Sequence, residues 1–178
     1  QGLLVTDTRA EHALVDGQYA QRRRSCEQAA RRLGVASLRE ISRAELAQAL
    51  AELDDDLLSR RARHVVTEID RVERAVTALA ADDYEGLGEL LLASHASLRD
   101  DYEVTVKELD LAVETACAAG ALGARMTGGG FGGSTIALVP ANEADAMAAA
   151  IERAFADANL RHPASFLATD VQGARREQ

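Results

Sequence analysis

The sequence predicts an α+β protein in which a small antiparallel sheet is combined with a block of helices. Three observations support this fold class. The 178-residue chain has the length of one domain, and it is 47% hydrophobic and 28% charged, as is typical of a protein with a packed core. Short β-type runs occur near both ends and on either side of a glycine-rich segment. The long stretch between the first two of these runs has helical periodicity, and such segregation indicates an α+β domain.

The N-terminal part of the chain predicts one strand and one helix. Residues 2–7 have the composition of a strand. Because no element precedes this strand to pair with it, we interpret the chain as a fragment of a longer protein. The dipeptide Asp16-Gly17 predicts a turn, and residues 18–33 predict a helix that ends at Gly34.

Two further helices follow. Ser42 and Glu45 have the spacing of a capping box and predict a short helix that ends near Leu53. Over residues 58–79, apolar side chains recur every three or four positions, with arginine and glutamate residues largely between them. This pattern predicts an amphipathic helix of more than twenty residues whose charges form a solvated face.

The middle of the chain predicts two more helices joined by a charged connector. Asp82 or Asp83 can cap a helix that runs to about Ser97. Residues 98–103 are the connector, and residues 105–108 form a second capping box that opens a helix to about residue 119.

The C-terminal part predicts the rest of the sheet. Residues 123–127 and 134–139 are strand-like runs on either side of the glycine-rich segment. An alanine-rich helix over residues 143–156 and a strand over residues 164–169 follow. No internal repeat and no low-complexity linker interrupts this order, so one domain is expected.

The glycine-rich segment over residues 128–133 is the most informative feature of the sequence. Glycine loses more backbone entropy on folding than any other residue, so such a cluster indicates required positive φ angles or close contact with a ligand. Consecutive amides in such a loop can form a nest for phosphate, whereas a tight hairpin turn would need only one or two glycines. The segment is therefore a candidate phosphate or substrate loop, formed by Gly128, Gly129, Gly130, Phe131, Gly132 and Gly133.

Three familiar nucleotide motifs do not fit this segment. A dinucleotide fingerprint needs a helix after the glycines, but a strand follows here. The P-loop pattern Gly-Lys-Ser/Thr does not occur, and Lys107 is the single lysine of the chain. A protein-kinase glycine loop would need a downstream lysine and two further sequence elements that are missing.

Composition excludes several classes of partner. A net charge of −9 argues against binding to nucleic acid or to an anionic membrane, and no run of about eighteen apolar residues predicts a membrane span. Cys26 and Cys117 have no partner spacing and are interpreted as reduced packing residues of a cytoplasmic protein. An anionic ligand would have to be held locally by amides, by one or two arginines and by Mg²⁺.

Several segments together resemble one known family. Residues 123–134 read Gly-Ala-Arg-Met-Thr-Gly-Gly-Gly-Phe-Gly-Gly-Ser. They resemble the third signature motif of the galactokinases, the sugar-kinase branch of the GHMP kinase superfamily. Residues 94–104 resemble the segment that precedes this motif, residues 12–24 resemble the opening of the C-terminal half, and residues 60–66 are also family-like.

The resemblance implies a fold and a domain organisation. Residues 1–178 resemble the GHMP kinase C-terminal domain, a ferredoxin-like α/β plait with a helical insertion. The N-terminal sugar motif and the serine-rich nucleotide loop of the family are missing, so an N-terminal nucleotide- and sugar-binding domain is absent from this chain. The general-base aspartate of the family lies in that domain. No catalytic residue is therefore assigned here, and none of the following aspartates is promoted to that role: Asp7, Asp16, Asp100 and Asp101.

The resemblance also implies a site. Tyr19 matches the tyrosine whose hydroxyl contacts galactose, and the glycine loop is expected to lie where the sugar and the transferred phosphate meet. Arg125, two residues before the loop, either offers charge to phosphate or pairs with a carboxylate. Arg99, Asp100 and Asp101 either organise the cleft through ion pairs or form a solvated connector. No metal site is expected, because the four histidines are scattered.

The implied activity is transfer of the γ-phosphoryl group of MgATP to the anomeric hydroxyl of galactose, within cytoplasmic galactose metabolism. ATP and Mg²⁺ would be held mainly by the absent N-terminal domain, so this chain alone is expected to be inactive and to be prone to self-association. A kinase for N-acetylgalactosamine and a non-catalytic sensor of galactose or ATP are the alternatives. The chain departs from the family pattern at Ser134, where cysteine is common, and in the polar residues 174–178, where a last strand is usual.

Overall fold

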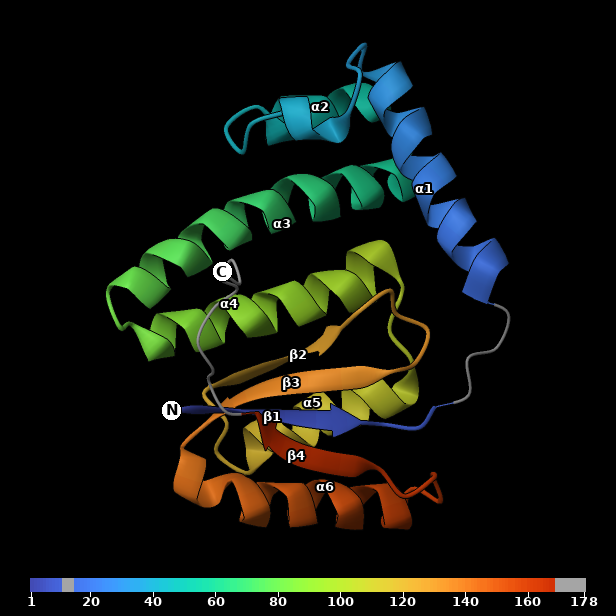
Figure 1. The fold of residues 1–178 in the computed structure, drawn as a ribbon. Helices are drawn as coiled ribbons and strands as arrows, with labels where there is room; N and C mark the ends of the chain where they lie inside the picture. The colour runs from blue at the N-terminus through green and yellow to red at the C-terminus, as the bar shows by residue number, and fades with distance from the viewer. Residues whose placement is uncertain (11–14, 169–178) are drawn as a thin grey trace, which may run out of the picture.

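The computed structural model describes residues 1–10 and 15–168, and Figure 1 shows how their elements are layered. Within these residues one sheet contains β1 (Gly2–Asp7), β2 (Gly123–Thr127), β3 (Ser134–Val139) and β4 (Ala164–Ala168). The α-helices are α1 (Val15–Arg32), α2 (Leu46–Leu53), α3 (Asp56–Ala80), α4 (Tyr84–Ser97), α5 (Lys107–Ala118) and α6 (Ala144–Asp157). Short 3₁₀ turns occur at Leu38–Glu40 and Ala141–Glu143, and a π-helical turn occurs at Leu98–Tyr102.

The sheet is antiparallel throughout, with the strand order β2-β3-β1-β4. β1 lies in its interior, where Leu4 is opposite Ala137 of β3 and Val5 is opposite Phe166 of β4. Both partners of the first strand thus come from later in the chain. In chain order, β1, α5, β2, β3, α6 and β4 form a βαββαβ unit, and α1 to α4 are inserted between β1 and α5. The expected α+β class and the plait with a helical insertion are confirmed.

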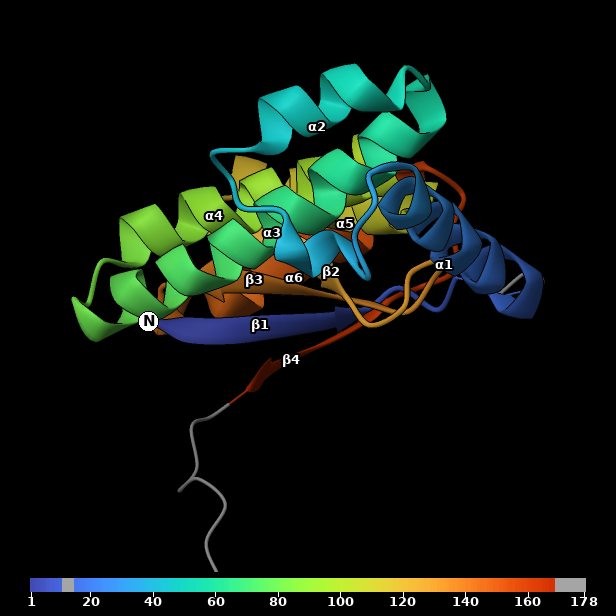
Figure 2. The same cartoon turned by 90° about the horizontal axis from the view of Figure 1, so that it is seen from above.

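The main core lies between the sheet and the helices α5 and α6. Side chains on alternate positions of the strands face these helices, because successive residues of a strand point to opposite faces. The buried cluster joins residues of the sheet to residues of the two helices and includes Leu4, Ala124, Ala137, Val139, Ala112, Val113, Ile151 and Phe155. Figure 2 shows the helices gathered on one side of the sheet. On its other face, Leu3 and Phe166 remain 39% and 60% exposed.

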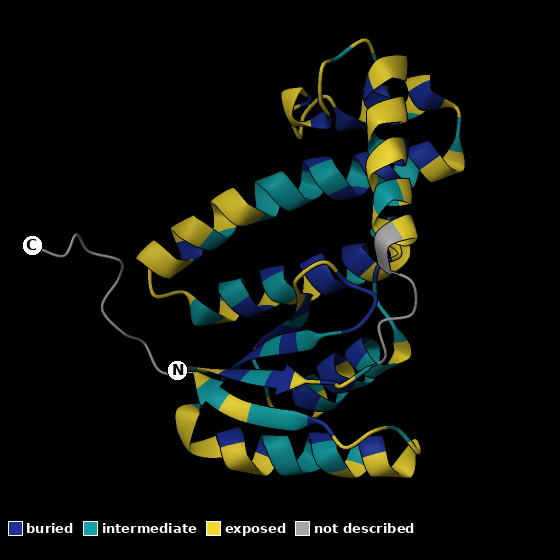
Figure 3. Cartoon of the chain, turned by 45° about the vertical axis from the view of Figure 1, so that its right-hand side comes forward, coloured by how far each residue is buried: buried dark blue, intermediate teal, exposed yellow. Residues whose placement is uncertain are grey.

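A second core holds the inserted helices together. It is made by α1, α2, the Leu38–Glu40 turn and the first half of α3, and includes Ala29, Leu38, Leu46, Leu53, Leu58 and Ala62. Figure 3 shows that these helices bury the sides on which they meet and expose their outer sides. This second core places α1 across one end of α3, close to the segment that leads into α5.

Helix α4 covers the outer edge of the sheet along β2. A Cβ atom on Gly88 would lie 2.2 Å from the carbonyl oxygen of Leu122, and one on Gly123 would lie 2.1 Å from the carbonyl oxygen of Gly88. Helix and strand therefore touch through their backbones. The free edge of β2 is capped by His95, whose Nδ1 accepts the N–H of Met126 over 3.1 Å. At this position, a backbone N–H of the edge strand that would otherwise be unpaired has a side-chain acceptor.

Some local expectations were wrong. Asp16 and Gly17 lie inside α1, because the helix begins at Val15. Helix α5 begins after Val106, so Thr105 does not form the expected capping box. The charged side of α3 is not fully solvated, since Arg61 is only 2% exposed.

The apolar stripe predicted along α3 is buried over only part of its length. Its C-terminal half remains exposed at Val72, Val76 and Leu79. Residue 169, to which the last strand is predicted to extend, lies outside the described residues, as do residues 174–178. Within the part of the chain that the structure describes, none of the helices combines the length and the hydropathy that a membrane crossing needs.

Candidate functional site

The glycine loop connects β2 and β3 at one end of the sheet. Positive φ angles occur at five of its six positions, namely Gly128, Gly130, Phe131, Gly132 and Gly133. Gly128 and Gly129 are exposed, whereas the part from Gly130 to Gly132 is buried. The expected requirement for left-handed backbone is confirmed, and the loop has an exposed tip and a packed base.

The packed base is fixed by two neighbouring backbone segments. The N–H of Phe131 donates to the carbonyl of Val104 over 2.7 Å. Near the other end of the loop, the carbonyl of Gly133 accepts both the N–H of Thr8 over 3.0 Å and its hydroxyl over 2.6 Å. Thr8 is completely buried. These contacts hold the hairpin without help from a ligand.

The glycines of the loop serve different purposes. A Cβ atom on Gly130 would lie 2.4 Å from the carbonyl oxygen of Val104. At this position the loop therefore packs closely against another backbone segment of the same chain. Of the two reasons for a glycine cluster, this position therefore reflects a close approach of the protein backbone and not of a ligand. At Gly128 and Gly129 a Cβ atom would meet nothing within 4 Å. The amides of these two exposed residues have no hydrogen-bond partner in residues 1–10 and 15–168, so they are available to an anion.

The segment that holds Phe131 is itself locked by two arginines of α3. Glu103 has a left-handed backbone, with φ of 56°, and its carboxylate lies 2.8 Å from Arg60 and also pairs with Arg61. These two guanidinium groups, Arg60 foremost, lower the pKa of Glu103 to about 2. Arg61 also donates to the carbonyl of Asp101. The chain from residue 101 to Val104 is thus fixed in the conformation that receives the loop.

Arg22 joins α1 to the same segment and to the loop. Its Nε donates to the carbonyl of Tyr102 over 2.7 Å, its Nη2 donates to the carbonyl of Glu103 over 2.6 Å, and its guanidinium lies 5.6 Å from the ring centre of Phe131. Burial and the nearby Arg61 lower the pKa of Arg22. The arginine therefore positions the helix that carries Tyr19 beside the loop.

Tyr19 lies one helical turn before Arg22, and residues three apart share a face of a helix. Its side chain is 55% exposed. The structure thus places an accessible tyrosine hydroxyl on the face of α1 that Arg22 ties to the loop.

The other candidate side chains are engaged in ion pairs. Arg125 lies 2.9 Å from Glu68, and its Nε donates to the carbonyl of Met126. This geometry matches the alternative in which Arg125 pairs with a carboxylate. Arg99 and Asp100 form an exposed pair at 2.8 Å, as expected of a solvated connector.

Asp101 accepts hydrogen bonds from Arg63 and from Ser97. It therefore belongs to the network that fixes the connector rather than to the exposed tip of the loop. Among the described residues, no group of three or more His, Cys, Asp or Glu side chains could hold a metal ion.

The positioning residues Thr8, Arg22, Arg61, Glu103 and Val104 were not identified from the sequence. Arg61 did leave one signal: it lies three residues after Leu58 and therefore on the apolar side of its helix. The other four carry no local pattern that distinguishes them from surface residues.

Known proteins resemble this chain in sequence over most of its length. The family model for the GHMP kinases C terminal matches residues 75–157. Galactokinase from Streptomyces coelicolor is 52% identical over 175 residues, which are 98% of this chain and 45% of the relative. Galactokinase from Mycobacterium tuberculosis is 51% identical over 162 residues, which are 91% and 44% of the two chains.

Similarity extends to a solved structure. The crystal structure of Lactococcus lactis galactokinase complexed with galactose superposes with a TM-score of 0.89 at 38% identity, covering 93% of this chain and 44% of that one. The chain thus spans somewhat less than half the length of the curated relatives it matches. The chain is therefore a homologue of the C-terminal region of the galactokinases, and its residues 75–157 match the C-terminal domain of the GHMP kinases.

Proposed function

We propose that this chain supplies the C-terminal part of a galactokinase, which transfers the γ-phosphoryl group of ATP to the anomeric hydroxyl of galactose. The observation that carries the proposal is the exposed tip of the loop, Gly128 and Gly129, held on a fixed base beside the face of α1 that bears Tyr19. Phosphoryl transfer depends mainly on positioning and on electrostatic stabilisation of the phosphoryl oxygens. The amides of Gly128 and Gly129 have no partner within the described residues and lie on a loop with a fixed base, so they can stabilise the charge of a phosphoryl oxygen.

The residues of this chain bind and orient rather than transfer protons. Tyr19 would donate its hydroxyl to the sugar, and the amides of Gly128 and Gly129 would hold a phosphate oxygen. Mg²⁺ would neutralise the charge of the phosphates when bound, but the described residues do not fit a resident metal site. The metal, most contacts to ATP and the general base are therefore assigned to an N-terminal domain that this chain does not contain.

The chain alone is proposed to be inactive and to self-associate. The apolar side chains left exposed on the open face of the sheet, Leu3 and Phe166, support this part of the proposal. We place the complete protein in the cytoplasm, in galactose metabolism.

A chimaera tests the proposed activity. In it, this chain replaces the matching C-terminal region of Streptomyces coelicolor galactokinase, and formation of galactose 1-phosphate from ATP and galactose is measured. Activity is expected with galactose, and a parallel assay with N-acetylgalactosamine distinguishes the related sugar kinase. Gly129→Val should abolish turnover while leaving the melting temperature unchanged, because a Cβ at Gly129 meets open space. A folded, monodisperse chimaera that phosphorylates neither sugar would overturn the proposal.

A further inference from the structure

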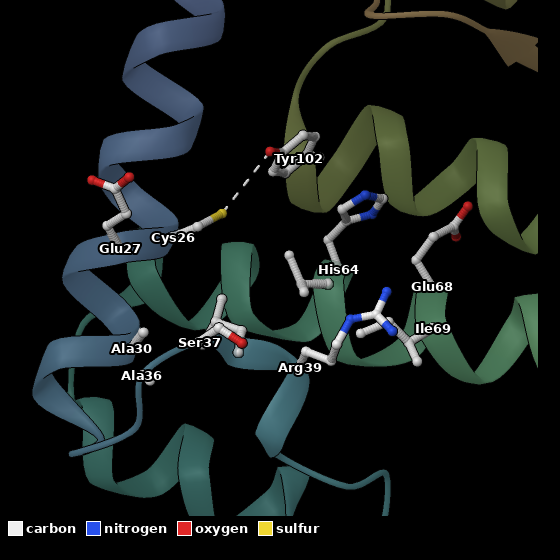
Figure 4. A pocket seen from close by; sticks show the side chains of 12 residues that line it. Cys26, Glu27, Ala30, Ala36, Ser37, Arg39, His64, Glu68, Ile69 and Tyr102 are labelled. Carbon is white, nitrogen blue, oxygen red and sulfur yellow. Dashed lines mark hydrogen bonds between the residues drawn. The ribbon is translucent and has the colours of Figure 1, made fainter.

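A pocket of about 440 Å³ opens between α1, the Leu38–Glu40 turn and α3 (Figure 4). Much of its wall is apolar and comes from Ala30, Leu38, Val65 and Ile69. Pockets of this size, lined by apolar side chains with a few convergent polar groups, are typical sites for small molecules. None of the lining residues belongs to the glycine loop, so this pocket is separate from the proposed substrate site.

One wall of the pocket carries His64, a largely buried residue with a ring nitrogen that can accept a hydrogen bond. The rings of His64 and Tyr102 stack with their centres 4.4 Å apart. Ser97 donates its hydroxyl to Asp101 over 3.0 Å, so its oxygen must accept the Nδ1–H of His64, also at 3.0 Å. The remaining ring nitrogen, Nε2, therefore bears a lone pair. His64 is only 6% exposed, and within the described residues its Nε2 has no partner.

Within the part of the chain that the structure describes, one cation at the pocket, Arg39, has no carboxylate partner. The carboxylate of Glu27 lies 2.8 Å from Arg23. That of Glu68 is paired with Arg71 at 2.7 Å and with Arg125 at 2.9 Å.

Arg39 is exposed, and no ion pair joins it to any residue in the described part of the chain. In Figure 4 its guanidinium extends along the same side of the pocket as Ile69 and His64. An entering anion would thus meet one unpaired positive charge beside an apolar chamber.

From these features, we propose that the pocket binds a small aromatic carboxylate that carries a hydroxyl group. The carboxylate pairs with Arg39, whose planar guanidinium suits bidentate recognition. The aromatic ring fills the space between Val65 and Ile69, and the hydroxyl of the ligand donates to Nε2 of His64. This site goes beyond the proposed kinase activity, and its occupancy can be measured without any phosphoryl transfer.

Titration of the purified chain with 4-hydroxyphenylacetate, followed by protein NMR, tests the proposal. We expect saturable binding with a dissociation constant of about 1 mM or below. Shifts should centre on Val65, Ile69 and the Nε2 resonance of His64. The neutral amide 4-hydroxyphenylacetamide should bind at least about fivefold more weakly, because it lacks the charge that meets Arg39.

Three variants separate the proposed contacts from general effects. Arg39→Gln should weaken binding of the acid about fivefold, whereas Arg43→Gln, which alters an exposed arginine outside the pocket, should leave it unchanged. Ile69→Trp should fill the chamber and abolish binding, with thermal unfolding used to verify that the variant is folded. The proposal is overturned by any of three results: no saturation up to about 10 mM, equal affinity for acid and amide, or an Arg39→Gln variant that binds as well as the parent chain.

Discussion

The N–H of Phe131 donates to the carbonyl of Val104 over 2.7 Å, and this contact fixes the glycine loop to the segment that leads into α5. The same carbonyl occupies the place that a side chain at Gly130 would need. The conformation of the loop is therefore imposed by the protein before any ligand arrives. A preorganised group of amides stabilises charge without a cost of rearrangement during the reaction.

Alanine at Gly130 is expected to destabilise the fold, whereas alanine at Gly129 should not. Gly130 has φ of 84° and no room for a Cβ atom, and the two effects together should lower the free energy of unfolding by about 2–4 kcal/mol. Gly129 has neither restriction, so its variant should stay within about 0.5 kcal/mol of the parent. Chemical denaturation of the two variants makes the comparison, and equal stabilities would contradict the assigned role of Val104.

Tyr19→Phe tests the sugar contact in the complete enzyme or in the active chimaera. Loss of one hydroxyl should raise the KM for galactose by about tenfold, since a hydrogen bond between neutral groups contributes about 1–1.5 kcal/mol. The KM for ATP should be nearly unchanged. Because the side chain is 55% exposed, the substitution should not affect folding. Steady-state kinetics with each substrate varied in turn provide the measurement, and an unchanged KM for galactose would remove Tyr19 from the site.

The elements of this fold could be predicted because their signals are local. The composition of residues 2–7 identified β1, and three- and four-residue periodicity identified α3. The interior position of β1 could not be read in the same way, because its pairing with β3 and β4 joins residues more than 120 positions apart. The turn expected at Asp16 and Gly17 failed for a related reason, since packing of α1 on α3 outweighs a weak local preference.

The candidate site was predictable only in part. The five glycines predict the loop. The local sequence does not show that a Cβ atom on Gly130 would clash with the carbonyl of Val104, whereas one on Gly129 would meet open space. Helical periodicity places Arg61 on the apolar side of α3, but it does not show which carboxylate pairs with the buried guanidinium. Its burial depends on Glu103, which lies 42 residues later.

Glu103→Gln tests whether the ion pairs with α3 hold the loop in place. The change leaves the buried Arg61 without a full negative partner, which should lower the free energy of unfolding. Because the side chain of Glu103 is 42% exposed, solvent screening limits the expected loss to about 1–2 kcal/mol. Glu89→Gln is the matched control, since Glu89 is exposed and has no ion pair in the described residues.

The same Glu103→Gln variant should also alter the loop itself. Amide hydrogen exchange at Phe131 should become faster, because the segment that accepts its N–H is less firmly held. Unchanged exchange at this amide, together with unchanged stability, would show that Glu103 does not position the loop.

His64 should make the stability of the chain depend on pH in mildly acidic solution. Its burial, aided by the positive charges of Arg71 and Arg125 and opposed by the negative charges of Glu68 and Asp101, lowers its pKa from 6.5 to about 4. Between these two values the unfolded chain binds a proton that the folded chain does not. The free energy of unfolding should therefore fall as the pH decreases from 6.5 toward 4, by as much as about 3 kcal/mol, and the contribution of His64 should level off below that.

His64→Gln provides the control for this pH dependence, because glutamine can still donate to Ser97 but does not titrate. The variant should be less stable than the parent near pH 7, where the stacking on Tyr102 is lost, and its free energy of unfolding should change less between pH 6.5 and 4. Glu68 and Glu103 also have lowered pKa values, so their contributions are lost only below about pH 4.5 and affect both proteins alike. Urea denaturation at half-unit intervals of pH measures the difference. Parallel curves for the two proteins would show that His64 accepts a proton as readily in the folded chain as in the unfolded one.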